Sequence, residues 1–158
     1  MSTILVSTQT ELQAAISSAN GGDVIQLAAG TYSALSIVNQ NYASNVTITS
    51  ADSANPAVIL GMNIKNSSNV TVSNVEMSEL VPGKLYGFQV YASQNVTLDH
   101  VDMHGPSAWG EFSDIALMMV RFSSNVTISN SEISNARYGV SVLDSDHVTV
   151  SDNFFHDL

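Results

Sequence analysis

The sequence predicts an all-β domain that winds as a parallel β-solenoid of about five coils, with an amphipathic helix over its first coil and an uncapped C-terminal end. The tripeptide Asn-Val-Thr recurs along the chain and sets the coil repeat. It begins at Asn45, Asn69, Asn95 and Asn125, with a near copy at His147, at intervals of 24, 26, 30 and 22 residues. Within each repeat, apolar and polar residues alternate over four or five positions, as in "NVTVS" and "NVTIS". That period is typical of a β-strand and not of a helix.

A helix is predicted before the first coil, over residues 9–20. Thr8 and Glu11 have the spacing of a capping box, and Gly21 with Gly22 ends the segment. Four apolar residues fall on one helical face: Leu12, Ala15, Ile16 and Ala19. A helix placed here covers the apolar end of a solenoid, which otherwise exposes core and unpaired backbone. The single domain, 1–158, therefore divides into a cap with the first strand (1–32) and stacked coils (33–158).

Three short strands are predicted in each coil, and loops of variable length absorb the differences between repeats. The repeat valines face inward and stack coil on coil, with the threonines outward beside them: Val46, Val70, Val96, Val126 and Val148, then Thr47, Thr71, Thr97, Thr127 and Thr149. Each such strand closes on a residue suited to a sharp turn: Asn74, His100, Asn130 or Asp152. Asn and Asp tolerate left-handed backbone better than other residues.

The C-terminal end carries no comparable cap. The segment "SDNFFHDL" stops in the third strand of a coil. Two interpretations remain open: the chain is a piece of a longer solenoid, or it is a subunit that covers this end by self-association, a homo-oligomer formed through the C-terminal coil.

Composition excludes several partner classes. The chain has 4 Lys and Arg against 14 Asp and Glu, with a net charge of −10, which repels nucleic acid and anionic membrane surfaces. No stretch reaches the roughly 18 apolar residues of a membrane span, and the start lacks the features of a Sec signal peptide. With no cysteine, the chain has no disulfides and no thiolate metal sites.

The segment "TELQAAISSANGGDVIQLAAGTY", residues 10–32, resembles the opening of right-handed parallel β-helix proteins of the pectate-lyase-like superfamily. It is most similar to alginate and chondroitin lyases and mannuronan epimerases. The resemblance implies a secreted, extracellular bacterial protein that acts on or binds acidic polysaccharides, often with calcium. The aspartate cluster of pectate lyases is missing, and "YGFQV" departs from the Asp-Pro-His signature of the epimerases at Gln89.

In this superfamily the substrate groove follows the face of the strand before Asn-Val-Thr. On that face Lys65, Tyr91 and Arg121 share one outward column, about 10 Å from end to end. They are the candidate catalytic residues, because β-elimination from a uronate needs a neutralised carboxylate, a base and an acid. The candidate substrate-binding residues come from the next column and from two long loops: Lys84, Gln89, His104, Trp109 and Glu111. The alternative is that these are ordinary outward residues.

A second outward column, Glu76, Asp102 and Glu132, lies on the third strand of successive coils. Carboxylates at that spacing repel one another, so they are either well solvated or hold a cation such as calcium.

Two hypotheses for function follow. In the first, the chain is the N-terminal β-helix part of a polysaccharide lyase or C5-epimerase that binds an acidic glycan and has weak or no activity alone. In the second, it is a non-catalytic structural or adhesin-like solenoid that self-associates through its open end.

Overall fold

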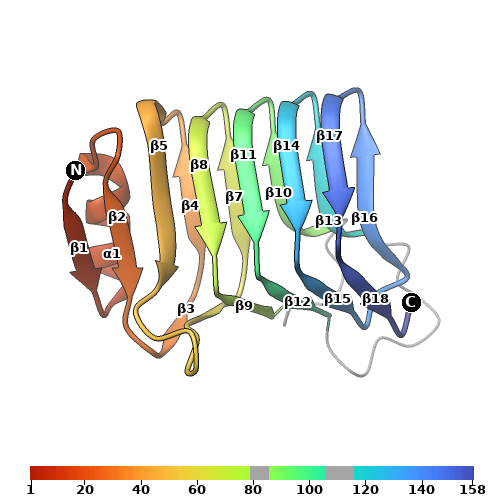
Figure 1. Ribbon diagram of the computed structural model, residues 1–158, viewed down its shortest axis with the longest axis horizontal. Coiled ribbons are helices and arrows are strands. Elements are labelled where there is room, and N and C mark those ends of the chain that lie inside the picture. The colour runs from red at the N-terminus through yellow and green to blue at the C-terminus, as the bar shows by residue number, and fades with distance from the viewer. Residues whose placement is uncertain (79–85, 106–115) are drawn as a thin grey trace.

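The computed structural model describes residues 1–78, 86–105 and 116–158. All its strand pairs are parallel, and the strands form three sheets that run along the long axis of the molecule (Figure 1). The prediction of a parallel β-solenoid is confirmed. From β4 to β16 the chain makes four full turns within the described ranges, close to the predicted count of about five coils.

Each coil contributes one strand to each sheet. Sheet A contains β1 (Thr3–Val6), β2 (Val24–Leu27), β5 (Asn41–Ser50), β8 (Ser68–Ser73), β11 (Gln94–Asp99), β14 (Ser124–Ser129) and β17 (Asp146–Ser151). Sheet B contains β3 (Thr31–Tyr32), β6 (Val58–Ile59), β9 (Glu76–Ser78), β12 (Asp102–His104), β15 (Glu132–Ser134) and β18 (Phe154–His156). Sheet C contains β4 (Leu35–Val38), β7 (Met62–Lys65), β10 (Tyr86–Tyr91), β13 (Ala116–Arg121) and β16 (Tyr138–Leu143).

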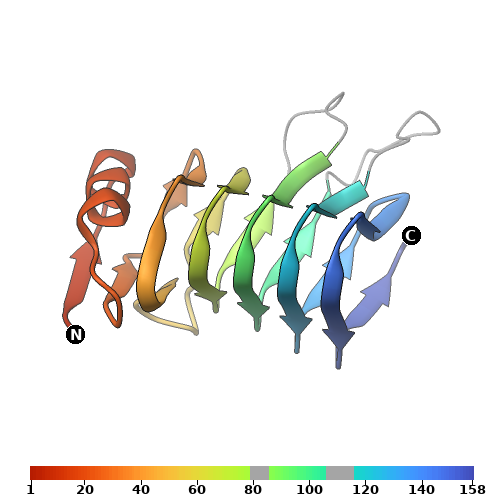
Figure 2. The same cartoon turned by 90° about the horizontal axis from the view of Figure 1, so that it is seen from above.

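The cap helix α1 (Gln9–Ser18) covers the first coil, as predicted, at the end that holds the N-terminus (Figures 1 and 2). Thr8 and Glu11 form the capping box, and Leu12, Ala15 and Ile16 are buried. The helix ends two residues earlier than the sequence indicates, with Ala19 as its C-cap. Strand β1, which precedes the helix and pairs with β2, was not predicted from the sequence.

Tyr42 ties the helix to the coil beneath it. Its hydroxyl donates a 2.7 Å hydrogen bond to the carbonyl oxygen of Ile16. Burial raises the pKa of Tyr42 to about 12, so the hydroxyl keeps its proton and this hydrogen bond over the whole neutral range. The covered end of the solenoid therefore gains a directional contact in addition to apolar packing.

The core is a stack of identical positions. Val46, Val70, Val96 and Val126 pair in register and are fully buried, as predicted, whereas the threonines beside them stay partly exposed. Val148, also predicted to face inward, pairs with Val126 and is only partly buried. Strands about 4.8 Å apart place each branched side chain on its neighbour without a gap. The inward-facing residues of the last coil have a neighbouring coil on one side only. Among them, Val142, Val150 and Phe155 are 43%, 41% and 39% exposed. No described element packs over the apolar side chains of this coil.

Left-handed residues make the corners. Asn74, His100, Asn130 and Asp152 have φ between 50° and 57°, which confirms the prediction for these turns. The asparagine that opens the tripeptide is also left-handed, with φ of 62° at Asn69, 55° at Asn95 and 53° at Asn125, a feature that the sequence analysis missed. These asparagines form an amide ladder in which Asn95 Nδ2 donates to Asn69 Oδ1 at 2.9 Å, and Asn125 Nδ2 donates to Asn95 Oδ1 at 3.3 Å.

A second ladder lies at the corner between sheets C and A. Ser67, Ser93 and Ser123 are buried, and each backbone N–H donates at 3.1 Å to the serine hydroxyl oxygen of the next coil. Each hydroxyl in turn donates at 2.8 Å to the carbonyl oxygen two residues earlier. The ladder satisfies backbone groups that the turn removes from the sheets.

Candidate functional site

The outward column on sheet C is present as predicted. Tyr91 pairs with Lys65 on one side and with Arg121 on the other, in register. Their neighbours Ile64, Val90 and Val120 are fully buried, so the alternation of the strand directs the column away from the core. Lys65 is exposed, and Tyr91 and Arg121 are half-buried.

Along this face two aromatic rings in contact with each other lie between two cations. Lys65 Nζ lies 5.6 Å from the centre of the Tyr91 ring, and the Tyr91 ring meets Phe122 edge-on with 5.6 Å between centroids. The guanidinium carbon of Arg121 lies 5.2 Å from the centre of the Phe122 ring. These contacts hold the two cations in place without neutralising their charge. We call Lys65, Tyr91, Arg121 and Phe122 the cationic face.

The cations of this face have no anionic partner within the described ranges. No carboxylate described by the structure lies within 4 Å of the ammonium of Lys65 or the guanidinium of Arg121. The Nε atom of Arg121 is buried and finds no acceptor among these residues. In a chain with a net charge of −10, two cations on one column without a described anionic partner favour the binding of an anionic ligand there.

Beside this column stands a row of polar residues that includes Gln89. Its Nε2 atom donates a 2.8 Å hydrogen bond to Asn63 Oδ1, its register partner one coil earlier. The bond fixes the direction of the Gln89 amide, and its carbonyl oxygen remains an acceptor at the edge of the cationic face.

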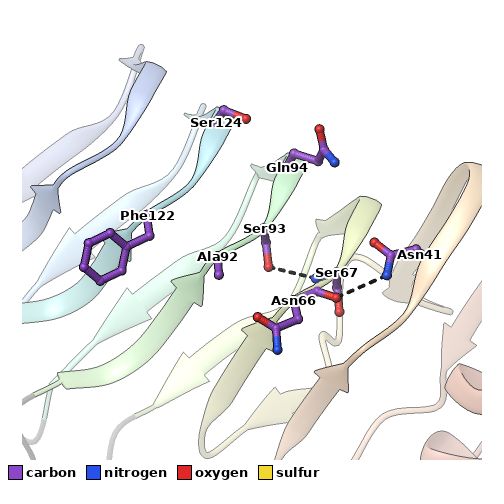
Figure 3. A pocket seen from close by; sticks show the side chains of 8 residues that line it. All are labelled: Asn41, Asn66, Ser67, Ala92, Ser93, Gln94, Phe122 and Ser124. Carbon is purple, nitrogen blue, oxygen red and sulfur yellow. Dashed lines mark hydrogen bonds between the residues drawn. The ribbon is translucent and has the colours of Figure 1, made fainter.

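An open depression adjoins the cationic face at the corner between sheets C and A (Figure 3). Its volume is about 380 Å³, and it is lined by Asn41, Asn66, Ser67, Ala92, Ser93, Gln94, Phe122 and Ser124. A second depression, of about 590 Å³, lies on the next coil and shares Phe122 and Ser124 with the first. We call them the first and second corner depressions.

The acidic column lies on sheet B, away from the cationic face. Glu76, Asp102 and Glu132 pair in register, one coil apart. His104 Nε2 lies 3.1 Å from Glu76 Oε1, and His156 Nε2 lies 2.8 Å from Glu132 Oε1. His104, predicted in the substrate groove, is therefore placed on sheet B beside a carboxylate.

The carboxylates of this column influence one another and lie close to histidines. Partial loss of hydration raises the pKa of Asp102, His104 opposes the rise, and the carboxylates of Glu132 and Glu76 add to it. Among residues 1–78, 86–105 and 116–158, no group of three or more His, Cys, Asp or Glu side chains converges to hold a metal ion. The assignment of Glu76, Asp102 and Glu132 to a cation such as calcium therefore stays a prediction.

Three of the predicted substrate-binding residues, Lys84, Trp109 and Glu111, lie outside the described residues. Sequence reasoning did not identify Phe122 as part of the site. The sequence did contain an indication, because Phe122 is a large aromatic residue at a corner where other coils have a small or polar one. The equivalent residues are Asn66, Ala92 and Asp144. Within the part of the chain that the structure describes, no helix has the length and apolar character needed to cross a bilayer.

The fold and the repeat define a right-handed parallel β-helix. A sequence model of the family described as "Right handed beta helix region" matches residues 33–158, and the chain belongs to this family. None of the curated proteins compared with the chain matched it.

Solved structures of polysaccharide lyases share this fold. A pectate lyase from Bacillus sp. N165, in complex with trigalacturonate, has a TM-score of 0.74 and 17% identity, over 98% of this chain and 57% of its own. An alginate lyase from Paenibacillus sp. str. FPU-7 has a TM-score of 0.52 and 16% identity, over 98% of this chain and 76% of its own. A PL6 family alginate lyase has a TM-score of 0.64 and 15% identity, over 97% of this chain and 28% of its own. The chain thus spans little more than half of the pectate lyase.

Proposed function

We propose that this chain forms the N-terminal β-helix part of a secreted bacterial protein that acts on acidic polysaccharides, as a β-eliminating lyase or a C5-epimerase. The observation that carries the proposal is the pair of cations on one face of sheet C, Lys65 and Arg121, which have no anionic partner among the residues that the structure describes. The folds shared with a pectate lyase and with alginate lyases support the same substrate class. We propose that the chain alone binds the glycan and has weak or no activity.

The spacing of the cationic face suits a polyuronate. Lys65 and Arg121 stand two coils apart, about 10 Å, with Tyr91 between them. Carboxylates on successive sugars of one chain can therefore meet different cations of the column. A planar guanidinium also accepts a carboxylate with two parallel hydrogen bonds, which gives Arg121 a role that lysine does not reproduce.

The residue types of this face can also serve the chemistry. In β-elimination a base removes the C5 proton, a C4–C5 double bond forms, the C4–O4 bond breaks, and the leaving oxygen takes a proton. We assign Arg121 to the substrate carboxylate, whose neutralisation acidifies the C5 proton, and we assign the two proton transfers to Lys65 and Tyr91. In epimerisation the same C5 proton is removed and a proton returns from the opposite side. Calcium enters the proposal only as an ion shared between glycan and protein carboxylates, and no step depends on it.

Binding of trigalacturonate and alginate trisaccharides by isothermal titration calorimetry tests this proposal. We expect Lys65→Gln and Arg121→Gln each to weaken binding about fivefold and the double variant about 30-fold, at roughly 1 kcal/mol per exposed charge contact. Added salt should weaken wild-type binding for the same reason. The matched control is Arg137→Gln, which makes the same change of charge outside this column. Equal affinity for all four variants and the wild type, or no binding at all, would contradict the proposal. Ultraviolet absorbance of unsaturated uronates measures lyase activity in the same samples.

A second candidate function, a non-catalytic solenoid that self-associates, is favoured by the open last coil. Val142, Val150 and Phe155 expose apolar surface there, and β16, β17 and β18 each pair on one side only. Because α1 covers the opposite end, association through this coil would join two open ends as a closed twofold dimer and not as a filament. Sedimentation equilibrium that shows a strict monomer at high concentration would contradict this candidate.

A further inference from the structure

Phe122 differs from the residues at the same corner of the other coils. The residue is 48% exposed although it is large and apolar. Its backbone is left-handed, with φ of 51°, a conformation that Asn66 and Asp144 adopt at the equivalent corners. Asparagine and aspartate adopt this backbone conformation readily, whereas an aromatic residue rarely does. Residues in such uncommon conformations occur often at functional sites. The contacts with Tyr91 and Arg121 orient the ring without covering it.

Phe122 lies between the two corner depressions and, with Ser124, lines both of them. One coil earlier, the equivalent corner residue is Ala92, whose methyl group leaves space beside the ring in the first corner depression. Figure 3 shows the ring clear of the Ser67 and Ser93 pair, with Ala92 between Phe122 and Asn66. An aromatic side chain thus stands at the edge of a concave, polar depression.

The rim of the first corner depression offers hydrogen-bonding groups without protein partners. Gln94 and Ser124 pair in register on β11 and β14, and their side chains bond to no other residue that the structure describes. Opposite them, the backbone carbonyl oxygen of Asn66 accepts a hydrogen bond of 3.4 Å from Asn41 Nδ2. The pocket therefore combines one apolar wall with free amide and hydroxyl groups, the surroundings that a pyranose ring requires.

The second corner depression differs from the first in charge. It is lined by Asp144 and Asp146 in addition to Phe122 and Ser124. Two carboxylates there repel an acidic sugar, whereas the first corner depression is uncharged and adjoins Arg121. An acidic glycan is therefore expected to bind in the first corner depression and not in the second.

We infer that the first corner depression is a subsite for one pyranose ring of the glycan, which places its apolar face against Phe122 and its hydroxyls toward Gln94 and Ser124. This inference rests on the proposed function, because the cationic face beside it holds the acidic groups of the same glycan. The subsite itself recognises the sugar ring and not its charge.

Two probes separate the ring contact from the charge contact: trigalacturonate and its fully methyl-esterified, uncharged form. The test variant is Phe122→Asn, since asparagine occupies the same left-handed corner at residue 66. We expect this variant to bind both probes about tenfold more weakly, the loss that removal of one aromatic contact produces. Phe122→Tyr, which keeps a ring, should retain wild-type affinity for both. Lys65→Gln should weaken only the binding of trigalacturonate.

The control is Phe154→Asn. It removes a different exposed phenylalanine, which lies on sheet B, and should leave the affinities for both probes unchanged. Wild-type affinity for Phe122→Asn would overturn the inference. If that variant melts at a lower temperature, the ring-proton NMR signals of Phe122 in the wild type decide instead, because a bound sugar must shift them. Wild-type binding of the ester alone would contradict the proposed acidic substrate and leave the subsite standing, whereas binding of neither probe would overturn both.

Discussion

Replacing Val96 with aspartate is expected to unfold the domain, whereas the same replacement at the adjacent Thr97 should leave it folded. Val96 is fully buried between Val70 and Val126, within the hydrophobic core. A carboxylate buried without a partner costs several kcal/mol, which is comparable with the whole stability of a typical domain, about 5–15 kcal/mol. Thr97 lies one residue further along β11 and points outward.

Far-ultraviolet circular dichroism and urea titration measure both variants under the same conditions. Val96→Asp should lack a cooperative transition at neutral pH, and Thr97→Asp should keep the wild-type midpoint to within a small shift. The two variants share the same added charge, so the difference between them reports only which side of the strand faces the core. A stable Val96→Asp, or an unfolded Thr97→Asp, would contradict the inward and outward assignment.

Replacing Phe88 with alanine should lower the free energy of unfolding by about 3–5 kcal/mol, the range for deletion of a buried phenylalanine ring. Phe88 is among the largest fully buried side chains, and its register partners in the neighbouring coils are Met62 and Met118. The flexible methionine side chains can fill part of the cavity, which favours the lower half of that range.

The matched control for this prediction is Phe154→Ala. Phe154 is 63% exposed on sheet B, so its loss should change the free energy of unfolding by no more than about 0.5 kcal/mol. Differential scanning calorimetry of both variants gives the comparison. A loss below about 1 kcal/mol for Phe88→Ala would mean that sheet C does not cover a packed core at this position.

The stacking of the coils could be predicted from the sequence because the repeat itself encodes it. Once Asn69, Asn95 and Asn125 are aligned, the alternation of the following strand decides which residues face inward, and the register of Lys65, Tyr91 and Arg121 follows from the same offset. In-register stacking leaves no freedom to shift one coil against the next without turning valines outward.

The alternation of apolar and polar residues did not predict which side chains of neighbouring coils are in contact. The contact of Phe122 with Tyr91 and Arg121 depends on a left-handed backbone at residue 122. An aromatic residue in the sequence does not predict that conformation. The placement of His104 against Glu76 likewise depends on where β12 ends. Alternation gives the face on which a residue lies, whereas the turn that follows decides which neighbours it meets.

The winding of the chain brings Lys65 and Arg121, which are 56 residues apart in sequence, onto one face two coils apart. The chain has no cysteine, so nitroxide labels on Lys65→Cys and Arg121→Cys report this pair alone. A backbone separation of about 10 Å predicts strong dipolar broadening of the electron paramagnetic resonance spectrum of the doubly labelled protein, relative to the two singly labelled proteins. A spectrum equal to the sum of the two single-label spectra would contradict the account.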